Sequence, residues 1–168
     1  MKKTQLIVMA LLMCFALVCC GGKKDAADST TIPDVASMKD KVKGFYGENV
    51  EFIAKADEYS NEVFQFSYQL EDEKFFAAAE DYLLTQCDGM SAETFVAIKF
   101  RDGVDKSMAE EAAEIIKTKY VAALKGKLEA YNPEAFAAAD DFKVTVYDNG
   151  LVFVICPDKA DDVLAALK

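Results

Sequence analysis

The long stretch of helical periodicity between Ser107 and Pro133 is the feature that most constrains how this chain folds. Over Met108 to Tyr131, apolar residues recur at steps of three, four and one, which places them along one side of an α-helix. We expect the helix to begin at a capping box formed by Ser107 and Glu110 and to end before Pro133. Such a helix is stable only when an apolar surface covers its apolar side, so the rest of the chain has to supply that surface.

Two short apolar runs after this helix predict a β-hairpin. They are Phe142 to Tyr147 and Leu151 to Cys156, and Asn149 and Gly150 lie between them. Asn-Gly between two such runs is typical of a two-residue type I′ turn, which needs positive φ at both central residues. Glycine adopts positive φ without strain, so we expect Gly150 to be required for this reason.

The register of the hairpin assigns its side chains to two faces. With Asn149 and Gly150 as the loop, Val146 lies opposite Phe153, and their face is apolar on both strands and is assigned to the core. The other face mixes polar and apolar side chains, so the Phe-rich segment before residue 80 or a partner is expected to cover it. The residues of this candidate interaction face are Lys143, Thr145, Tyr147, Val152, Val154 and Cys156.

Shorter patterns complete the predicted domain. A helical period over 34–46 predicts an N-terminal helix, the Ala-rich stretch 72–80 predicts a short one, and Pro157 opens a C-terminal helix. Residues 94–100 are rich in β-forming side chains and predict a strand. Apolar residues at every second position over 64–70 predict another, half-buried strand. We therefore expect an α+β fold in which the long helix and a C-terminal helix pack an antiparallel sheet of three to five strands.

The N-terminus has the pattern of an export signal. Lys2 and Lys3 precede an uncharged apolar run, Leu6 to Val18, that is too short for a comfortable transmembrane span. The run ends in Leu17-Val18-Cys19-Cys20-Gly21, which resembles the lipobox of bacterial lipoproteins. Cys20 fits as the lipid acceptor better than Cys19, because Val18 before the cleavage point would suit the small pocket of a signal peptidase poorly. An ordinary secretory signal with a coincidental cysteine is the alternative.

Lipidation at Cys20 would divide the chain into three parts: a signal peptide at 1–19, a flexible tether at 20–32 and a single α+β domain at 33–168. The acyl chains would anchor the protein to the cell membrane on its extracytoplasmic side, since two chains hold a protein on a bilayer where one does not. Loss of Lys2 and Lys3 from 19 basic and 29 acidic residues leaves a net charge of −12. Anionic lipid repels such a body, so we expect the lipid group to be its membrane attachment.

Composition and spacing exclude several kinds of chemistry. The chain has no His and no Trp, which excludes Ser-His-Asp and Cys-His nucleophile systems and His-rich zinc sites. Arg101 is the only arginine of this acidic chain, so nucleic acid is not an expected partner. Asp140 and Asp141 point opposite ways if the chain is extended, and the stretch from Asp102 to Asp105 lacks the ligand spacing of a calcium loop. We therefore assign no catalytic residue, no metal ligand and no cofactor.

Cys87 and Cys156 are the two thiols that remain after lipidation and removal of the signal. Outside the cytoplasm they could form a disulfide, although spacing alone cannot show this. The simpler interpretation is that both are small buried residues.

Three motifs in the second half of the chain resemble a known family. They are Met90-Ser91-Ala92-Glu93-Thr94-Phe95-Val96-Ala97-Ile98-Lys99, Tyr131-Asn132-Pro133-Glu134 and Asn149-Gly150-Leu151-Val152-Phe153-Val154. Their order is similar to that of a domain-of-unknown-function family of small lipoproteins from Gram-positive anaerobes, and the similarity covers Tyr82 to Lys168. The resemblance implies an exported lipoprotein and carries no catalytic residues with it.

Together these observations predict a lipid-anchored, non-enzymatic binding or interaction module of the bacterial envelope, with an unknown envelope protein as its partner. The alternative is a lipoprotein that binds a small ligand or hydrolyses one with carboxylates alone. An exposed apolar surface would favour the first function, and a deep pocket with convergent carboxylates would favour the second.

Overall fold

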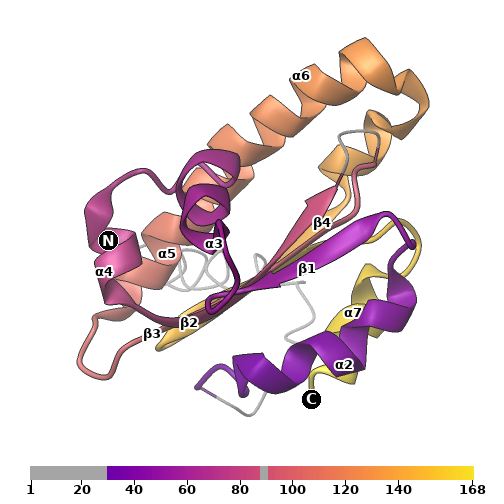
Figure 1. Ribbon diagram of the computed structural model, residues 1–168. Helices are drawn as coiled ribbons and strands as arrows, with labels where there is room; N and C mark the ends of the chain where they lie inside the picture. Colours follow the sequence, from indigo (N-terminus) through magenta and orange to yellow (C-terminus); the bar gives the residue numbers. More distant parts are fainter. Residues whose placement is uncertain (1–29, 88–90) are drawn as a thin grey trace, which may run out of the picture.

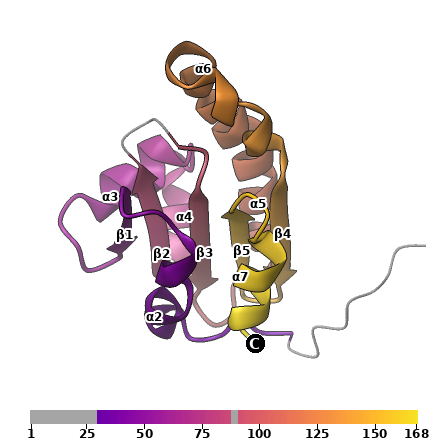
Figure 2. The ribbon, with the colours of Figure 1, turned by 90° about the vertical axis from the view of Figure 1, so that its right-hand side faces the viewer.

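The computed structural model describes residues 30–87 and 91–168, which form one antiparallel sheet with helices on both faces (Figures 1 and 2). The sheet order is β1-β2-β3-β5-β4, so the hairpin lies beside the central strand β3. This confirms the predicted α+β fold. The signal peptide and Cys20 lie outside the described residues. The strands are β1 (Val50–Ala54), β2 (Ala79–Cys87), β3 (Thr94–Phe100), β4 (Phe142–Tyr147) and β5 (Gly150–Ile155).

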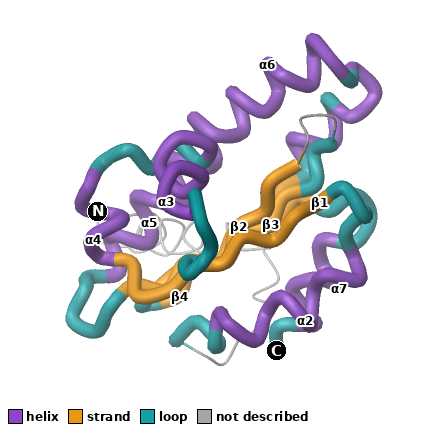
Figure 3. Tube along the Cα trace, in the orientation of Figure 1, coloured by secondary structure: helices purple, strands orange, loops and turns teal. Residues whose placement is uncertain are grey.

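The helices form a layer on each side of the sheet, as the purple segments above and below the orange strands show in Figure 3. In the part of the chain that the structure describes, none of them is long and apolar enough to cross a membrane. The first layer contains α3 (Ser60–Glu62), η3 (Val63–Ser67), α4 (Glu73–Ala78), α5 (Lys106–Ile115), η4 (Ile116–Tyr120), α6 (Val121–Tyr131), η5 (Pro133–Ala135) and η6 (Ala137–Asp140). The second layer contains η1 (Val35–Ser37), α2 (Met38–Val42), η2 (Lys43–Phe45) and α7 (Ala160–Ala166).

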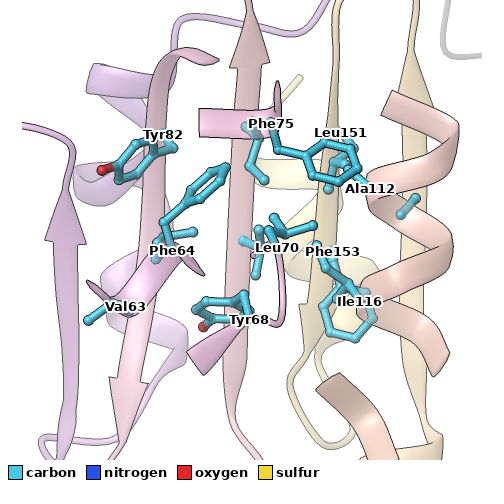
Figure 4. Packing of buried hydrophobic residues seen from close by; sticks show 14 of the residues in the cluster. Val63, Phe64, Tyr68, Leu70, Phe75, Tyr82, Ala112, Ile116, Leu151 and Phe153 are labelled. Carbon is cyan, nitrogen blue, oxygen red and sulfur yellow. The ribbon is translucent and has the colours of Figure 1, made fainter. Parts of the chain in front are cut away.

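Each layer encloses its own hydrophobic core. In the first core Ile116 of the long helix packs on Phe153 of β5, and Phe64 and Tyr68 pack over β2 and β3 (Figure 4). In the second core, Met38 and other apolar residues of the two terminal helical segments cover the opposite face. The central strands β3 and β5 are therefore apolar on both faces, unlike the half-solvated strands of a two-layer fold.

The long helix is confirmed, but its start differs from the prediction. It begins at Lys106, and Asp105 is the N-cap, because Asp105 Oδ1 accepts a hydrogen bond from the backbone N–H of Ser107 at 2.8 Å. Hydrogen bonds from Ser107 also lower the pKa of Asp105. The prediction of a capping box by Ser107 and Glu110 was wrong. The N-cap lies two residues earlier, because Asp105 already caps the first turn. A π-helical turn, η4, interrupts the regular α-helix.

The hairpin is present, with a register that differs by two residues from the predicted one. Its loop consists of Asp148 and Asn149, and Tyr147 lies opposite Gly150. Side chains alternate between faces with a period of two, so a shift of two keeps each side chain on the face predicted for it. Val146 and Phe153 accordingly belong to the first core.

Gly150 is required by close packing and not by its φ angle. Among the described glycines only Gly103 has positive φ, at 85°. A Cβ atom added at Gly150 would lie 2.3 Å from the carbonyl oxygen of Ile98 and 3.1 Å from Cγ2 of Ile32. The type I′ prediction was wrong, because the hairpin turns without positive φ while β3 approaches Gly150 too closely for a side chain.

The prediction of a strand over 64–70 was wrong, because residues 64–67 belong to the π-helical turn η3 and residues 68–70 lie in the loop that follows it. Val63 and Phe64 are both buried although they are adjacent, whereas Phe66 is 62% exposed. The buried positions follow the helical steps of three, one and four from Ser60 through Val63 and Phe64 to Tyr68. β1 takes the edge of the sheet beside β2, which leaves this segment to cover the first core.

The folded domain begins earlier than the predicted boundary at residue 33. Asp148 N donates to the carbonyl oxygen of Thr30 at 2.7 Å, and Ile32 N donates to Oδ1 of Asn149 at 2.9 Å. Ile32, assigned to the tether, is buried because its side chain fills the space beside Gly150. The chain thus enters the domain next to the β4–β5 turn, which we call the tether end of the sheet.

Candidate functional site

The predicted interaction face is part of the second core. Val152 and Val154 are fully buried, and Cys156 is 2% exposed. Residues of η1, α2 and α7, among them Met38 and Val163, cover them. These helical segments have apolar sides of their own, and the open face of the sheet is the surface that buries them. Val152, Val154 and Cys156 are therefore not available to a partner, and this assignment is corrected.

The polar members of that face are half-buried on the edge strand β4. Lys143 Nζ lies 3.7 Å from Oδ1 of Asp161 in α7, so the lysine reaches across to the covering helix. Tyr147 packs against the second core, and burial raises the pKa of its hydroxyl. Together with Thr145, these residues border the α7 contact and do not form an open surface.

The acidic patterns of the sequence have structural roles. Asp140 forms an ion pair with Lys125 of α6, which ties η6 to the long helix. The stretch from Asp102 to Asp105 is a turn followed by the N-cap of α5. Within residues 30–87 and 91–168, no group of three or more acidic or cysteine side chains is placed to hold a metal ion.

The strands β2 and β3 separate at the end of the sheet opposite the tether end. The last backbone pair between the two strands is Leu84 with Val96. Beyond this pair, the side chain of Thr85 forms the hydrogen bonds to β3 in place of the backbone. Thr85 Oγ1 accepts from Phe95 N at 2.8 Å and donates to Phe95 O at 3.3 Å. Cys87 Sγ then donates to the carbonyl oxygen of Glu93 at 3.0 Å. We call this region, with Ser91 to Glu93 and Cys156, the far end of the sheet.

Two tyrosines with tilted, adjoining rings close the first core at the far end. The rings of Tyr68 and Tyr120 are 4.6 Å apart, with an angle of 31° between their planes. Tyr68 OH donates to the carbonyl oxygen of Thr85 at 2.6 Å, and Tyr120 OH lies 2.7 Å from Oγ1 of Thr94. Burial raises the pKa of both phenols, that of Tyr120 to about 12. Sequence reasoning missed this network, because it placed Tyr68 in a strand and its partners are distant in sequence.

Two small cavities meet at the far end, where both are lined by Ser91 and Glu93. One has a volume of about 100 Å³ and extends past Tyr120 to Lys127, and the other has a volume of about 390 Å³ and extends to Lys159. The carboxylate of Glu93 accepts hydrogen bonds from Gly47 N at 3.3 Å and Ser91 Oγ at 3.2 Å. The arrangement offers one fixed carboxylate and two ammonium groups to a small polar ligand.

Cys87 and Cys156 do not form a disulfide with each other. β2 and β5 lie on opposite sides of β3, so two strand spacings of about 4.8 Å each separate their backbones. A disulfide requires Cα atoms closer than about 7 Å. Burial raises the pKa of the Cys156 thiol, which agrees with the interpretation of this residue as a small buried one.

The surface of residues 56–73 differs in character from the rest of the domain, and we call it the acidic aromatic segment. Among the described residues three large hydrophobic side chains are exposed, and Tyr59, at 67%, and Phe66, at 62%, belong to this segment. The third, Tyr131, lies at the end of α6, which projects beyond the sheet in Figure 1. The segment also has six acidic residues and no Lys or Arg: Asp57, Glu58, Glu62, Glu71, Asp72 and Glu73.

The backbone of this segment is held in uncommon conformations. Tyr59 and Gln69 have φ of 64° and 61°, values that cost a non-glycine residue about 1 kcal/mol or more. Buried contacts hold the segment, because Ser60 Oγ donates to the carbonyl oxygen of Lys55 at 2.9 Å and Tyr82 OH donates to Ser60 Oγ at 3.0 Å. The exposed rings therefore stand on a fixed and well-packed support.

Comparison of the chain with protein-family models, curated proteins and solved structures finds no match. The class that the structure defines is an α+β domain with a five-stranded antiparallel sheet between two helical layers. The resemblance to small lipoproteins of Gram-positive anaerobes stays a prediction.

We expect the stability of the domain to fall above pH 10 because of the buried phenols. The pKa of Tyr120 is about 12 in the folded protein against an ordinary value of 10, so the folded state holds its proton more tightly than the unfolded state. This contribution to stability is complete below about pH 10 and is lost as the pH rises toward 12. Over that range each such phenol lowers the free energy of unfolding by up to about 1.4 kcal/mol per pH unit. Urea midpoints of the wild type and Tyr120→Phe between pH 8 and 12 test this. The variant should show the shallower decline, and identical profiles would contradict the assignment.

Proposed function

We propose that this protein is a lipid-anchored module of the bacterial envelope that binds a macromolecular partner and has no catalytic role of its own. The observation that carries the proposal is the exposure of Tyr59 and Phe66 on the fixed support of the acidic aromatic segment. Rigid aromatic side chains are enriched among the residues that dominate the energy of protein interfaces. The buried hairpin face no longer serves this purpose, so the binding surface is assigned to the acidic aromatic segment.

The N-terminal sequence supports an extracytoplasmic position for this surface. With Cys20 as the lipid acceptor, nine residues lie between it and Thr30, the first residue that the structure describes, which is bonded to Asp148 at the tether end. A chain of that length spans at most about 35 Å. The domain would therefore stay close to the membrane but could turn its exposed aromatic residues toward a neighbouring molecule of the envelope.

A second candidate function is the binding of a small polar ligand at the far end. Glu93 lines both cavities there, together with Lys127 in the smaller one and with Glu134 and Lys159 in the larger one. An acid and a base that line the same cavity suit a ligand that carries both charges. This function needs no macromolecule at the acidic aromatic segment, so one experiment separates the two candidates.

The test is site-specific photo-crosslinking in the intact cells that make the protein. Benzoylphenylalanine at position 66 should give an adduct of higher mass, because the proposed partner covers the ring of Phe66. The same group at Tyr131 is the matched control, since this aromatic residue is equally exposed but lies outside the segment. Absence of an adduct at position 66, or equal adducts at both positions, would contradict the proposal.

A further inference from the structure

The sequence around Tyr59 and Phe66 is strongly acidic, and of its six carboxylates only that of Asp72 lies in an ion pair within the described residues. The two lysines that flank the segment are engaged elsewhere: Lys55 Nζ donates to two backbone carbonyls of β2, at 2.8 and 3.0 Å, and Lys74 Nζ lies 2.7 Å from Glu111 of α5. Lys74 also lies 3.6 Å from Asp72, so one of the six carboxylates is partly compensated.

The carboxylates nearest in sequence to the exposed rings have no cation beside them. Among the described residues, no Lys or Arg forms an ion pair with Glu58 or Glu62. Both side chains belong to exposed residues. A ligand that docks on the rings would therefore also meet the negative charges of Glu58 and Glu62, which we call the rim.

The two rings are also well exposed, at 67% for Tyr59 and 62% for Phe66. Within residues 30–87 and 91–168, neither Tyr59 nor Phe66 stacks on another aromatic ring or lies under an ammonium group. The face of an aromatic ring attracts a cation, with about 0.5 to 2 kcal/mol per contact. The same chain uses this contact internally, where Lys125 Nζ lies 4.5 Å from the centre of the Phe136 ring.

We infer that the acidic aromatic segment docks a cationic polypeptide segment of the partner. Its Lys or Arg side chains would lie on the rings of Tyr59 and Phe66, and the surrounding carboxylates would bind the remaining charge. This inference rests on the proposed function, which places a macromolecule on the segment, and it adds the chemistry of that macromolecule.

Charge also argues against the two other occupants of such a surface. An anionic membrane would be repelled by six carboxylates. A second copy docked segment to segment would bring two such acidic sets together, which a symmetric interface cannot avoid because it uses the same patch twice. A cationic segment is the occupant that gains from both the rings and the rim.

The test uses the full lipidated protein in phosphatidylcholine nanodiscs and a defined probe. The probe is a fluorescent 12-residue peptide of alternating Lys and Ser, and the control probe is the same peptide with every lysine acetylated. Binding of the first peptide should weaken with added salt, and the combined change Tyr59→Ser and Phe66→Ser should lower its affinity about tenfold or more. Tyr131→Ser is the matched control and should leave the affinity unchanged.

A second variant tests the rim separately from the rings. Glu58→Gln combined with Glu62→Gln keeps both aromatic side chains and should reduce both the affinity and its dependence on salt. All four changed residues are exposed, and circular dichroism verifies that each variant is folded.

Several results would overturn the inference. They are equal binding of the acetylated peptide, wild-type affinity in the ring variant, and an equal loss in Tyr131→Ser. Binding to phosphatidylglycerol vesicles, or self-association in sedimentation, that depends on Tyr59 and Phe66 while the cationic peptide does not bind would assign the surface to another occupant.

The crosslinking experiment distinguishes failure of this inference from failure of the proposed function. An adduct at position 66 whose partner peptide has an excess of Lys and Arg supports both. An adduct with a neutral or acidic partner peptide leaves the proposed function in place and overturns the inference. No adduct at position 66 overturns the proposed function itself.

Discussion

Cys20→Ala should move the protein completely out of the membrane fraction. The proposed lipid would be attached through a thioether, which alanine cannot form, and the net charge of −12 that cleavage would leave gives the body no affinity for anionic lipid. Fractionation of cells followed by immunoblotting measures the distribution, and mass spectrometry of the wild-type protein measures the acyl groups. Complete loss is expected because the two acyl chains are the proposed attachment.

The neighbouring cysteine provides the matched control for this experiment. Cys19 is the last residue removed if Cys20 is the acceptor, and alanine is the usual residue at that position of a lipobox. Cys19→Ala should therefore leave the protein lipidated and bound to the membrane. Membrane retention of Cys20→Ala, together with a wild-type mass that lacks acyl chains, would contradict the anchor. Retention of Cys20→Ala with loss of Cys19→Ala would assign the lipid to Cys19.

Gly150→Ala should lower the stability of the domain by about 2 to 4 kcal/mol. The new Cβ would lie 2.3 Å from the carbonyl oxygen of Ile98, a backbone atom of the central strand that cannot move without disturbing its neighbours in the sheet. The Ile32 side chain, 3.1 Å away, lies beside the same position. Urea denaturation followed by circular dichroism measures the change in the free energy of unfolding.

Two further variants identify the cause of this loss. Gly126→Ala is the matched control, because Gly126 is exposed on α6 and a Cβ there would meet nothing within 4 Å. Alanine favours a helix over glycine, so this variant should be more stable by about 0.5 to 1 kcal/mol. Gly150→Asn tests the alternative, because asparagine tolerates positive φ. It should be at least as harmful as Gly150→Ala if close packing is the cause, and a milder effect would restore the positive-φ explanation.

The elements that could be predicted from the sequence are those with a strong local signal. The long helix has more than six turns of consistent periodicity, and the hairpin has two apolar runs joined by turn residues. The register of the hairpin was wrong by two residues, yet its faces were right, because a shift of two returns every side chain to the same face. Local patterns thus determined which side chains are apolar and how they alternate.

Tertiary contacts decided the elements whose local signal was ambiguous. Residues 64–70 alternate as a strand would, but Val63 and Phe64 are needed side by side over the first core, which only a helical turn permits. Gly150 shows the same dependence on tertiary structure. Its sequence context indicates a turn, whereas the constraint on it comes from Ile98, a residue 52 positions earlier that no local pattern connects to it.

The candidate site shows most clearly what the sequence alone determined. Composition excludes histidine-dependent chemistry, and the N-terminal pattern alone carries the prediction of a lipid anchor, since Cys20 lies outside the described residues. The acidic stretch 56–73 and its aromatic residues are also visible in the sequence, but their exposure is not. Apolar patterning shows which side chains avoid water without showing which layer covers them. Val154, which was expected on an open face, is therefore buried by the second helical layer. Phe66, which was expected in a half-buried strand, is exposed because its neighbours fill the first core.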